Sequence, residues 1–115
     1  MSDTPFRKVD TVFVRVDDPH AAAEWYKETL GWTEQFRTEH IVVVAGPEGP
    51  PVTLIDPGPE EWSGFNFYAP DAAAARAWLI ERGVEVGPLQ LATDQSVTWF
   101  WFRDPAGNRL EVCSY

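Results

Sequence analysis

Hydrophobic and polar residues alternate in the first strongly patterned stretch of the chain, residues 9–16. Val12, Val14 and Val16 fall on one side of the pattern, whereas Thr11, Phe13 and Arg15 fall on the other. Because successive side chains of a β-strand point to opposite faces of the sheet, this alternation predicts a strand with one apolar face and one mixed face. The first predicted element is therefore a strand whose two faces have different neighbours.

A helix is predicted directly after this strand, over residues 19–30. Asp17 or Asp18 can cap its first turn, and Pro19 suits the first helical position. Gly31 follows the run as a C-terminal cap. The buried side of the helix is predicted to consist of Trp25, Tyr26 and Leu30.

The same order of elements begins again in the second half of the chain. An alternating strand at residues 64–69 precedes Asp71 and a second helix, which ends at Gly83. When the two halves are aligned, Trp78 falls on Trp25. Such self-similarity at half the chain length indicates two copies of one supersecondary unit.

Three short strands are predicted after each helix, separated by polar or Gly- and Pro-rich turns. In the first half they are residues 32–36, 41–45 and 52–55. In the second half they are residues 84–86, 96–102 and 109–114, with residues 89–95 as a loop. Each half is therefore a βαβββ unit.

The predicted fold class is α+β, with two βαβββ modules in a single domain spanning residues 1–115. The modules are residues 7–57 and 62–115. Each helix can cover only one face of its strands, so the opposite faces have to be buried against each other or around something else. This predicts a concave, cleft-bearing mixed sheet.

The last seventeen residues, 99–115, predict a β-hairpin with a tight turn. Asp104 and Pro105 favour a type I turn, and Gly107 supplies the positive φ that a three-residue hairpin loop needs. This turn predicts the pairs Asp104 with Asn108, Phe102 with Leu110, Trp101 with Glu111, and Trp99 with Cys113.

The two faces of this hairpin differ in composition. The face suited to packing under a helix holds Phe100, Phe102, Leu110 and Val112. The other face holds Trp99, Trp101, Glu111 and Cys113. Two large aromatics beside a carboxylate suggest a binding surface. The structural alternative, in which the tryptophans are core and Glu111 is a solvated edge charge, stays open on the pattern alone.

Composition narrows the classes of function. The 115 residues include 9 basic and 18 acidic side chains, and the net charge of −9 disfavours nucleic acid and anionic membranes as partners. The single cysteine, Cys113, excludes an intramolecular disulfide and is expected to act as a small apolar side chain. We expect a cytoplasmic protein, because neither a signal region nor a membrane-spanning stretch is present.

Two motifs resemble the vicinal oxygen chelate superfamily of glyoxalases, bleomycin-resistance proteins and extradiol dioxygenases. They are WYKETLGW at residues 25–32 and FRDPAGNRLEV at residues 102–112. The second is close to the recurring Asp-Pro-Asp-Gly-Asn of this superfamily, with Ala106 at the second aspartate. The resemblance covers nearly the whole chain and implies the same two-module fold.

The resemblance also implies positions for a metal site. Metal-dependent members bind a divalent ion with four His, Gln or Glu side chains, one each from the first and last strand of both modules. These positions fall on Thr11, on Thr53 (or Leu54 with a one-residue slip), on Gly64 and on Glu111. Of these residues, only Glu111 has a side chain that commonly binds a divalent metal ion. Catalytic metal sites need about three protein ligands. We therefore expect neither a metal nor another cofactor.

The functional hypothesis is a metal-independent protein that binds a small molecule and sequesters an antibiotic or toxic compound. The predicted pocket residues are Thr11, Phe13, Asn66, Tyr68, Trp99, Trp101 and Glu111. The ligand is expected to be cationic or aromatic, and the protein to be a homodimer. The alternative is an enzyme: a metal-dependent or Glu111-based lyase, isomerase or dioxygenase, with Glu111 as the catalytic base. A protein acting only through its surface is a third possibility.

Overall fold

The computed structural model describes residues 4–56, 62–92 and 96–115, with side chains of Trp62 and Ser63 excepted. It divides into two compact units. One, which we call the first unit, comes from residues 11–60. The other, the second unit, comes from residues 61–115 together with residues 1–10.

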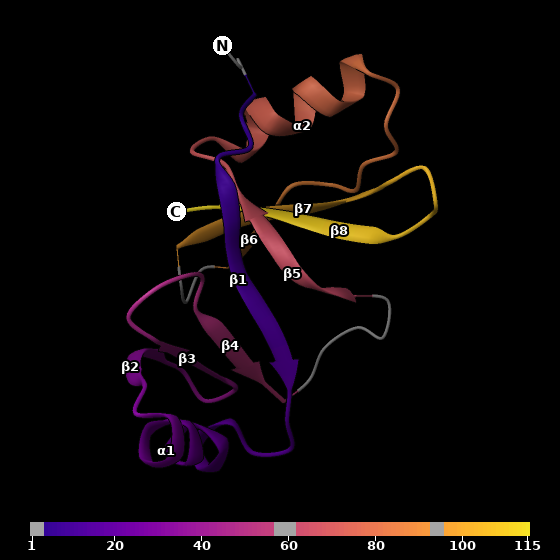
Figure 1. Ribbon diagram of the computed structural model, residues 1–115. Coiled ribbons are helices and arrows are strands. Elements are labelled where there is room, and N and C mark those ends of the chain that lie inside the picture. The colour runs from indigo at the N-terminus through magenta and orange to yellow at the C-terminus, as the bar shows by residue number, and fades with distance from the viewer. Residues whose placement is uncertain (1–3, 57–61, 93–95) are drawn as a thin grey trace. The chain divides into compact units, whose positions relative to one another are not determined.

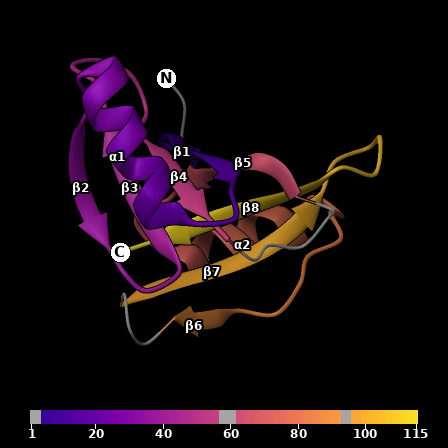
Figure 2. The ribbon, with the colours of Figure 1, turned by 90° about the horizontal axis from the view of Figure 1, so that it is seen from below.

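The first unit has the predicted βαβββ order. Its elements are β1 (Lys8–Arg15, from Thr11 onward), α1 (Pro19–Leu30), β2 (Thr33–Arg37), β3 (Ile41–Ala45) and β4 (Val52–Ile55). The strands lie in the order β2-β3-β4-β1, with β1 parallel to β4 and the other pairs antiparallel. Helix α1 lies along one face of these strands (Figure 2).

Local signals set the ends of α1 as expected. The side chain of Asp18 accepts hydrogen bonds from the backbone N–H groups of His20 and Ala21. Gly31 ends the helix with a left-handed φ of 70°. A residue with a Cβ adopts this conformation only with strain, so glycine suits the position.

The sheet-facing side of α1 differs from the prediction. Ala23 is fully buried against the core strands, whereas Trp25 is 53% exposed and Leu30 47% exposed. With 3.6 residues per turn, Pro19, Ala23 and Tyr26 share the inner face and Trp25 points away from it. Leu30 falls on the inner side as well, but it is the last residue of the helix and remains exposed there. The prediction that Trp25 and Leu30 supply the buried side was therefore wrong. The largest fully buried side chains here are Val42, Val44 and Leu54.

The second unit repeats the βαβββ order. Its elements are β5 (Trp62–Tyr68), α2 (Ala72–Glu81), β6 (Gln90–Ala92), β7 (Val97–Arg103) and β8 (Arg109–Ser114). The strand order is β5-β8-β7-β6, with β5 and β8 parallel (Figure 1). Residues 4–10 belong to this unit: the Arg7 N–H donates to the Tyr68 carbonyl, and the Phe6 ring packs against Phe67 and Phe102.

The core of the second unit confirms one of the two predicted hairpin faces. Phe100 and Val112 are fully buried, with Ala75 and Leu79 of α2 in the same cluster and Phe102 packed against it. The tryptophans Trp99 and Trp101 alternate with these residues along β7. They therefore lie on the face turned away from α2.

The hairpin register is as predicted. Strand β7 pairs with β8 through Trp99 with Cys113, Phe100 with Val112, Trp101 with Glu111, and Phe102 with Leu110. The Asp104 side chain accepts hydrogen bonds from the N–H groups of Ala106 and Asn108, and Gly107 has a φ of 89°. Turn chemistry at Asp104 and Gly107 therefore sets which side chains meet across the hairpin.

One strand of the second unit lies elsewhere than predicted. Residues 84–86 form only an isolated bridge, Val86 with Phe102, and the strand is β6, within the segment expected to be a loop. Backbone hydrogen bonds hold Glu85 and Gly87 beside β7. Pro88 has no N–H to continue the ladder, so pairing stops there and resumes at Gln90.

Both predicted βαβββ modules, and hence the α+β class, are confirmed. The closure of the two modules around a cleft stays a prediction, as does the description of residues 1–115 as one domain. Among the described residues, no helix is both long and apolar enough to span a lipid bilayer.

Candidate functional site

The second unit has a sheet face that its own helix does not cover. Register places side chains in two rows across β5, β8 and β7, because paired residues share a face. The first row is Asn66, Glu111 and Trp101. The second row is Tyr68, Cys113 and Trp99. We call these six residues the aromatic face.

The first row combines buried polar groups with an aromatic ring. Asn66 is 7% exposed and Glu111 is 8% exposed, and Trp101 beside them is half-buried. A buried carboxylate is costly unless charges or hydrogen bonds compensate it. An amide that both donates and accepts, next to a carboxylate that accepts, can recognise several polar groups of a small molecule.

Two arginines flank this row. Arg109 Nη2 lies 3.7 Å from Glu111 Oε2. The guanidinium carbons of Arg103 and Arg109 each lie 5.5 Å from the centre of the Trp101 ring. Neither arginine was among the predicted pocket residues, although they stand two residues from Trp101 and Glu111 and therefore share their face.

Trp101 is held in position by a glycine outside the predicted pocket. A Cβ atom on Gly87 would overlap Nε1 of the Trp101 indole. The Gly87 N–H also donates to the Trp101 carbonyl at 2.8 Å, and its own carbonyl accepts from Arg76 Nε of α2 at 2.7 Å. Gly87 is therefore a positioning residue, which a sequence pattern could not identify without the fold.

Tyr115 lies beside the second row and contacts Tyr68. Tyr115 donates a hydrogen bond to Asp10 at 2.7 Å, and its ring centre lies 4.8 Å from that of Tyr68. Cys113 is buried, and desolvation with the nearby Asp10 carboxylate raises the pKa of its thiol. A thiol held protonated is a poor nucleophile, which agrees with the expectation that Cys113 has no catalytic chemistry.

The remaining predicted pocket residues lie in the first unit. Thr11 and Phe13 are on the face of β1 opposite the valines that pack under α1, as predicted, and Phe13 pairs with Thr53. The hydroxyl oxygens of Thr11 and Thr53 are 2.8 Å apart, and Thr11 also donates to the Pro51 carbonyl at 3.0 Å. The joining of these residues with the aromatic face in one pocket stays a prediction.

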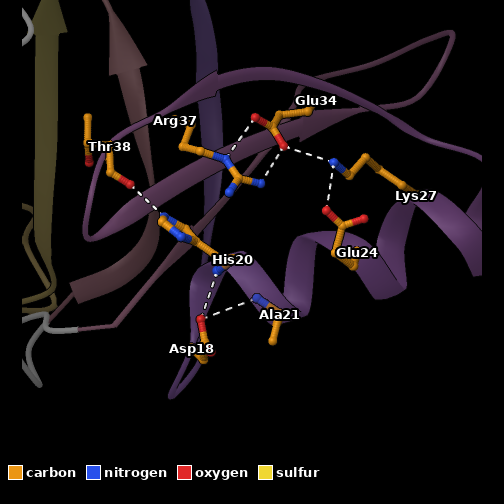
Figure 3. Close-up of polar contacts among 8 residues, drawn as sticks. All are labelled: Asp18, His20, Ala21, Glu24, Lys27, Glu34, Arg37 and Thr38. Atoms are coloured by element: carbon orange, nitrogen blue, oxygen red, sulfur yellow. Dashed lines mark hydrogen bonds and ion pairs between the residues drawn. The ribbon is translucent and has the colours of Figure 1, made fainter.

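The two histidines lie in the first unit and have partners there. Nε2 of His20 is 2.8 Å from the carbonyl oxygen of Thr38 (Figure 3). His40 is 59% exposed, and its ring pairs with the Asp56 carboxylate at 2.9 Å, which raises the pKa of His40. Each histidine ring therefore has a polar partner within the first unit.

The metal-site positions of the resembling superfamily do not hold a suitable set of donors. Parallel pairing of Phe13 with Thr53 and of Asn66 with Glu111 makes Thr53 and Glu111 equivalent positions in the two units. The alternative at Leu54 is excluded, because that side chain is fully buried under α1. Two neutral hydroxyls and a glycine cannot replace the missing imidazoles or carboxylates. No group of three His, Cys, Asp or Glu able to hold a metal ion occurs within the described part of the chain.

Two βαβββ units, each a mixed sheet with one helix on one face, define the class of the vicinal oxygen chelate proteins. Residues 11–113 match the family model described as a glyoxalase-like domain. The chain therefore belongs to the glyoxalase-like domain family.

Solved structures share this fold at low sequence identity. Methylmalonyl-CoA epimerase from Mycobacterium tuberculosis has a TM-score of 0.75 and 19% identity, covering 99% of this chain and 91% of that chain. A second methylmalonyl-CoA epimerase has a TM-score of 0.76 and 22% identity, covering 100% and 99%. A third, in complex with methylmalonyl-CoA and ammonium, has a TM-score of 0.66 and 16% identity, covering 95% and 94%. No curated protein matches the sequence.

Proposed function

We propose that this chain binds a planar organic molecule on its aromatic face and does so without a metal ion. The observation that supports this most directly is the row of Asn66, Glu111 and Trp101 on the sheet face that α2 leaves uncovered. Ligand sites are mostly apolar or aromatic surfaces with a few placed polar groups. This row has that composition.

The energetics of such a face are sufficient for binding a small molecule. Aromatic pairs contribute ~0.5–1.5 kcal/mol beyond the apolar area they bury. A hydrogen bond to a charged group adds ~1.5–3 kcal/mol. Stacking against Trp99 or Trp101 together with one polar contact at Glu111 or Asn66 could therefore anchor a planar ligand.

The donor set supports binding that is independent of a metal. Thr11 and Thr53 hydrogen-bond to each other, and Gly64 offers no side chain. Glu111 is paired with Arg109, which already compensates part of its charge. Sequestration of an antibiotic or toxic aromatic compound is the role that this surface fits best.

An enzyme is the second candidate, because the similar folds include epimerases. In that case Glu111 would be the general base, removing a proton next to a carbonyl group of the substrate. Incubation with an acyl thioester in deuterium oxide tests this directly. Deuterium incorporation that Glu111→Gln abolishes would favour catalysis over sequestration.

Calorimetric titration tests the binding proposal. We expect saturable binding of planar aromatic compounds, and at least tenfold weaker binding for Trp101→Ala and for Glu111→Gln. Trp25→Ala is the matched control, because Trp25 is an exposed tryptophan of α1 in the first unit. Unchanged affinity in both site variants would refute the proposal. So would unfolding of Glu111→Gln, because the carboxylate would then be structural.

A further inference from the structure

We propose that the end of the aromatic face next to the hairpin turn holds an anionic group of the ligand, a carboxylate, between Arg103 and Arg109. This inference rests on the proposed function and names the chemical class of the ligand. It replaces the cationic ligand favoured by the sequence with an aromatic carboxylate.

Register brings the two arginines together on the aromatic face. Arg103 and Arg109 are direct partners in the β7–β8 ladder. They stand two residues from Trp101 and Glu111 and so share their side of the sheet. Each guanidinium lies 5.5 Å from the Trp101 ring centre, which places positive charge at one edge of the aromatic surface.

Contacts to the turn and to nearby carboxylates preorganise these side chains. Arg103 Nη1 donates to the Gly107 carbonyl at 3.1 Å, which ties it to the hairpin loop. Its Nε is 3.6 Å from Glu85, and Arg109 Nη2 is 3.7 Å from Glu111. A ligand carboxylate that made charge-assisted hydrogen bonds to the two guanidiniums would lie at about 2.7–2.9 Å, closer than Glu85 and Glu111 do in these two ion pairs.

The geometry of the two guanidiniums fits an anion. A guanidinium offers a planar fork of N–H donors that matches a carboxylate bidentately. Of the two neighbouring carboxylates, Glu85 is 65% exposed, so water screens its charge, and Glu111 is buried and faces Arg109. A cationic ligand beside Trp101 would meet two positive guanidiniums. The net charge of −9 acts over longer distances and is screened by salt.

Three probes with one ring system test the subsite: 2-naphthoate, 2-naphthamide and 2-naphthylmethylammonium. They share the planar surface and differ in charge, so their affinities separate stacking from charge recognition. By calorimetry we expect 2-naphthoate to bind about tenfold more tightly than the amide, as one charge-assisted hydrogen bond would give. The ammonium should bind most weakly.

Variants assign this preference to the two arginines. Arg103→Gln and Arg109→Gln should each reduce the carboxylate-over-amide ratio towards one. Arg109→Lys, which keeps the charge opposite Glu111, should retain the fold and lose only part of the ratio. Arg82→Gln is the matched control, because Arg82 also stacks on a tryptophan, Trp78, but follows α2.

The outcomes separate this inference from the proposed function. Equal binding of all three probes, or a ratio that survives both glutamine variants, would overturn the anionic subsite and leave an aromatic binding face. Tighter binding of the ammonium would overturn it as well. If none of the probes binds, the proposed function fails together with the subsite.

Discussion

A single backbone position, Gly87, sets where the Trp101 indole can lie. In Gly87→Ala the new methyl group would overlap Nε1 of Trp101, so the indole has to move. We expect a shift in tryptophan emission, at least tenfold weaker binding of planar ligands and a loss of stability of ~1–3 kcal/mol, the usual cost of overpacking. Emission spectra, calorimetry and urea unfolding measure the three effects.

Gly46→Ala is the control for this substitution. A Cβ at Gly46 would lie 2.9 Å from Cε2 of Trp32, in the first unit. It should also cost stability but should leave ligand affinity unchanged. Equal loss of binding in both variants would show that Gly87 acts only through general stability.

The threonine pair offers a second test at the residue scale. Thr11 donates its only hydroxyl hydrogen to the Pro51 carbonyl, so Thr53 has to be the donor between the two hydroxyls. Thr53→Val should then cost ~0.5–1.5 kcal/mol, and Thr11→Val ~1–3 kcal/mol, because it affects both Thr53 and Pro51. Urea unfolding of both variants and of the double variant measures this. A loss of stability in the double variant that equals or exceeds the sum of the two single losses would contradict the hydrogen bond.

Thr11, Thr53 and Gly64, at three of the four metal-ligand positions, predict the metal content of the protein. Because hydroxyls and glycine stand where metal-dependent members of the superfamily have His, Gln or Glu, we expect less than a tenth of an equivalent of zinc, iron, nickel or manganese after purification. Elemental analysis of protein grown with added metals measures this. About one equivalent that disappears in Glu111→Gln would overturn the metal-free assignment.

At the scale of elements, an ion-pair network joins α1 to β2. Glu34 accepts hydrogen bonds from Lys27 at 3.0 Å and from Arg37 at 2.7 Å, and Lys27 also pairs with Glu24 (Figure 3). The hydrogen bonds from Arg37, then from Lys27, lower the pKa of Glu34 from 4.5 to about 2. The network therefore stabilises the fold only while Glu34 is ionised.

Acid titration of stability tests this network. A carboxyl whose pKa is lower in the folded state stabilises fully above pH 4.5, and this contribution is lost as pH falls towards 2. Wild-type protein should therefore lose more stability between pH 5 and pH 2 than Glu34→Gln does. Urea midpoints across this range measure the difference. Glu28→Gln, which removes an exposed carboxylate of α1 outside the network, should keep the wild-type slope.

At the scale of the whole molecule, the strand order of the first unit has β2 at one end and that of the second unit has β6 at one end. Leu91 of β6 is 62% exposed, and an apolar edge strand favours pairing with another chain. We expect a homodimer, measured by light scattering as twice the 13.0 kDa chain mass. Leu91→Lys should shift the protein towards monomer, whereas Ile80→Lys on α2 should not. A wild-type monomer at micromolar concentration would contradict this.

Local chemistry explains what could be predicted from the sequence. The βαβββ order, the Asp18 and Gly31 caps and the hairpin register all follow from signals within a few residues of each other. Alternation sets which strand residues share a face, and a turn residue such as Gly107 sets the register. These two signals together are enough to place Trp101 and Glu111 side by side.

Contacts between distant segments were decided only by the tertiary structure. Three features depend on which surfaces meet in the folded chain, and no local pattern encodes this. They are the exposed position of Trp25, the strand at Gln90–Ala92 and the packing of Trp101 against Gly87. The sequence by itself determined the two modules and the residues of the aromatic face. Alternation along the strands also puts Arg103 and Arg109 on this face. The tertiary structure decided how closely the two guanidiniums approach the Trp101 ring, because that depends on side-chain packing across the folded sheet.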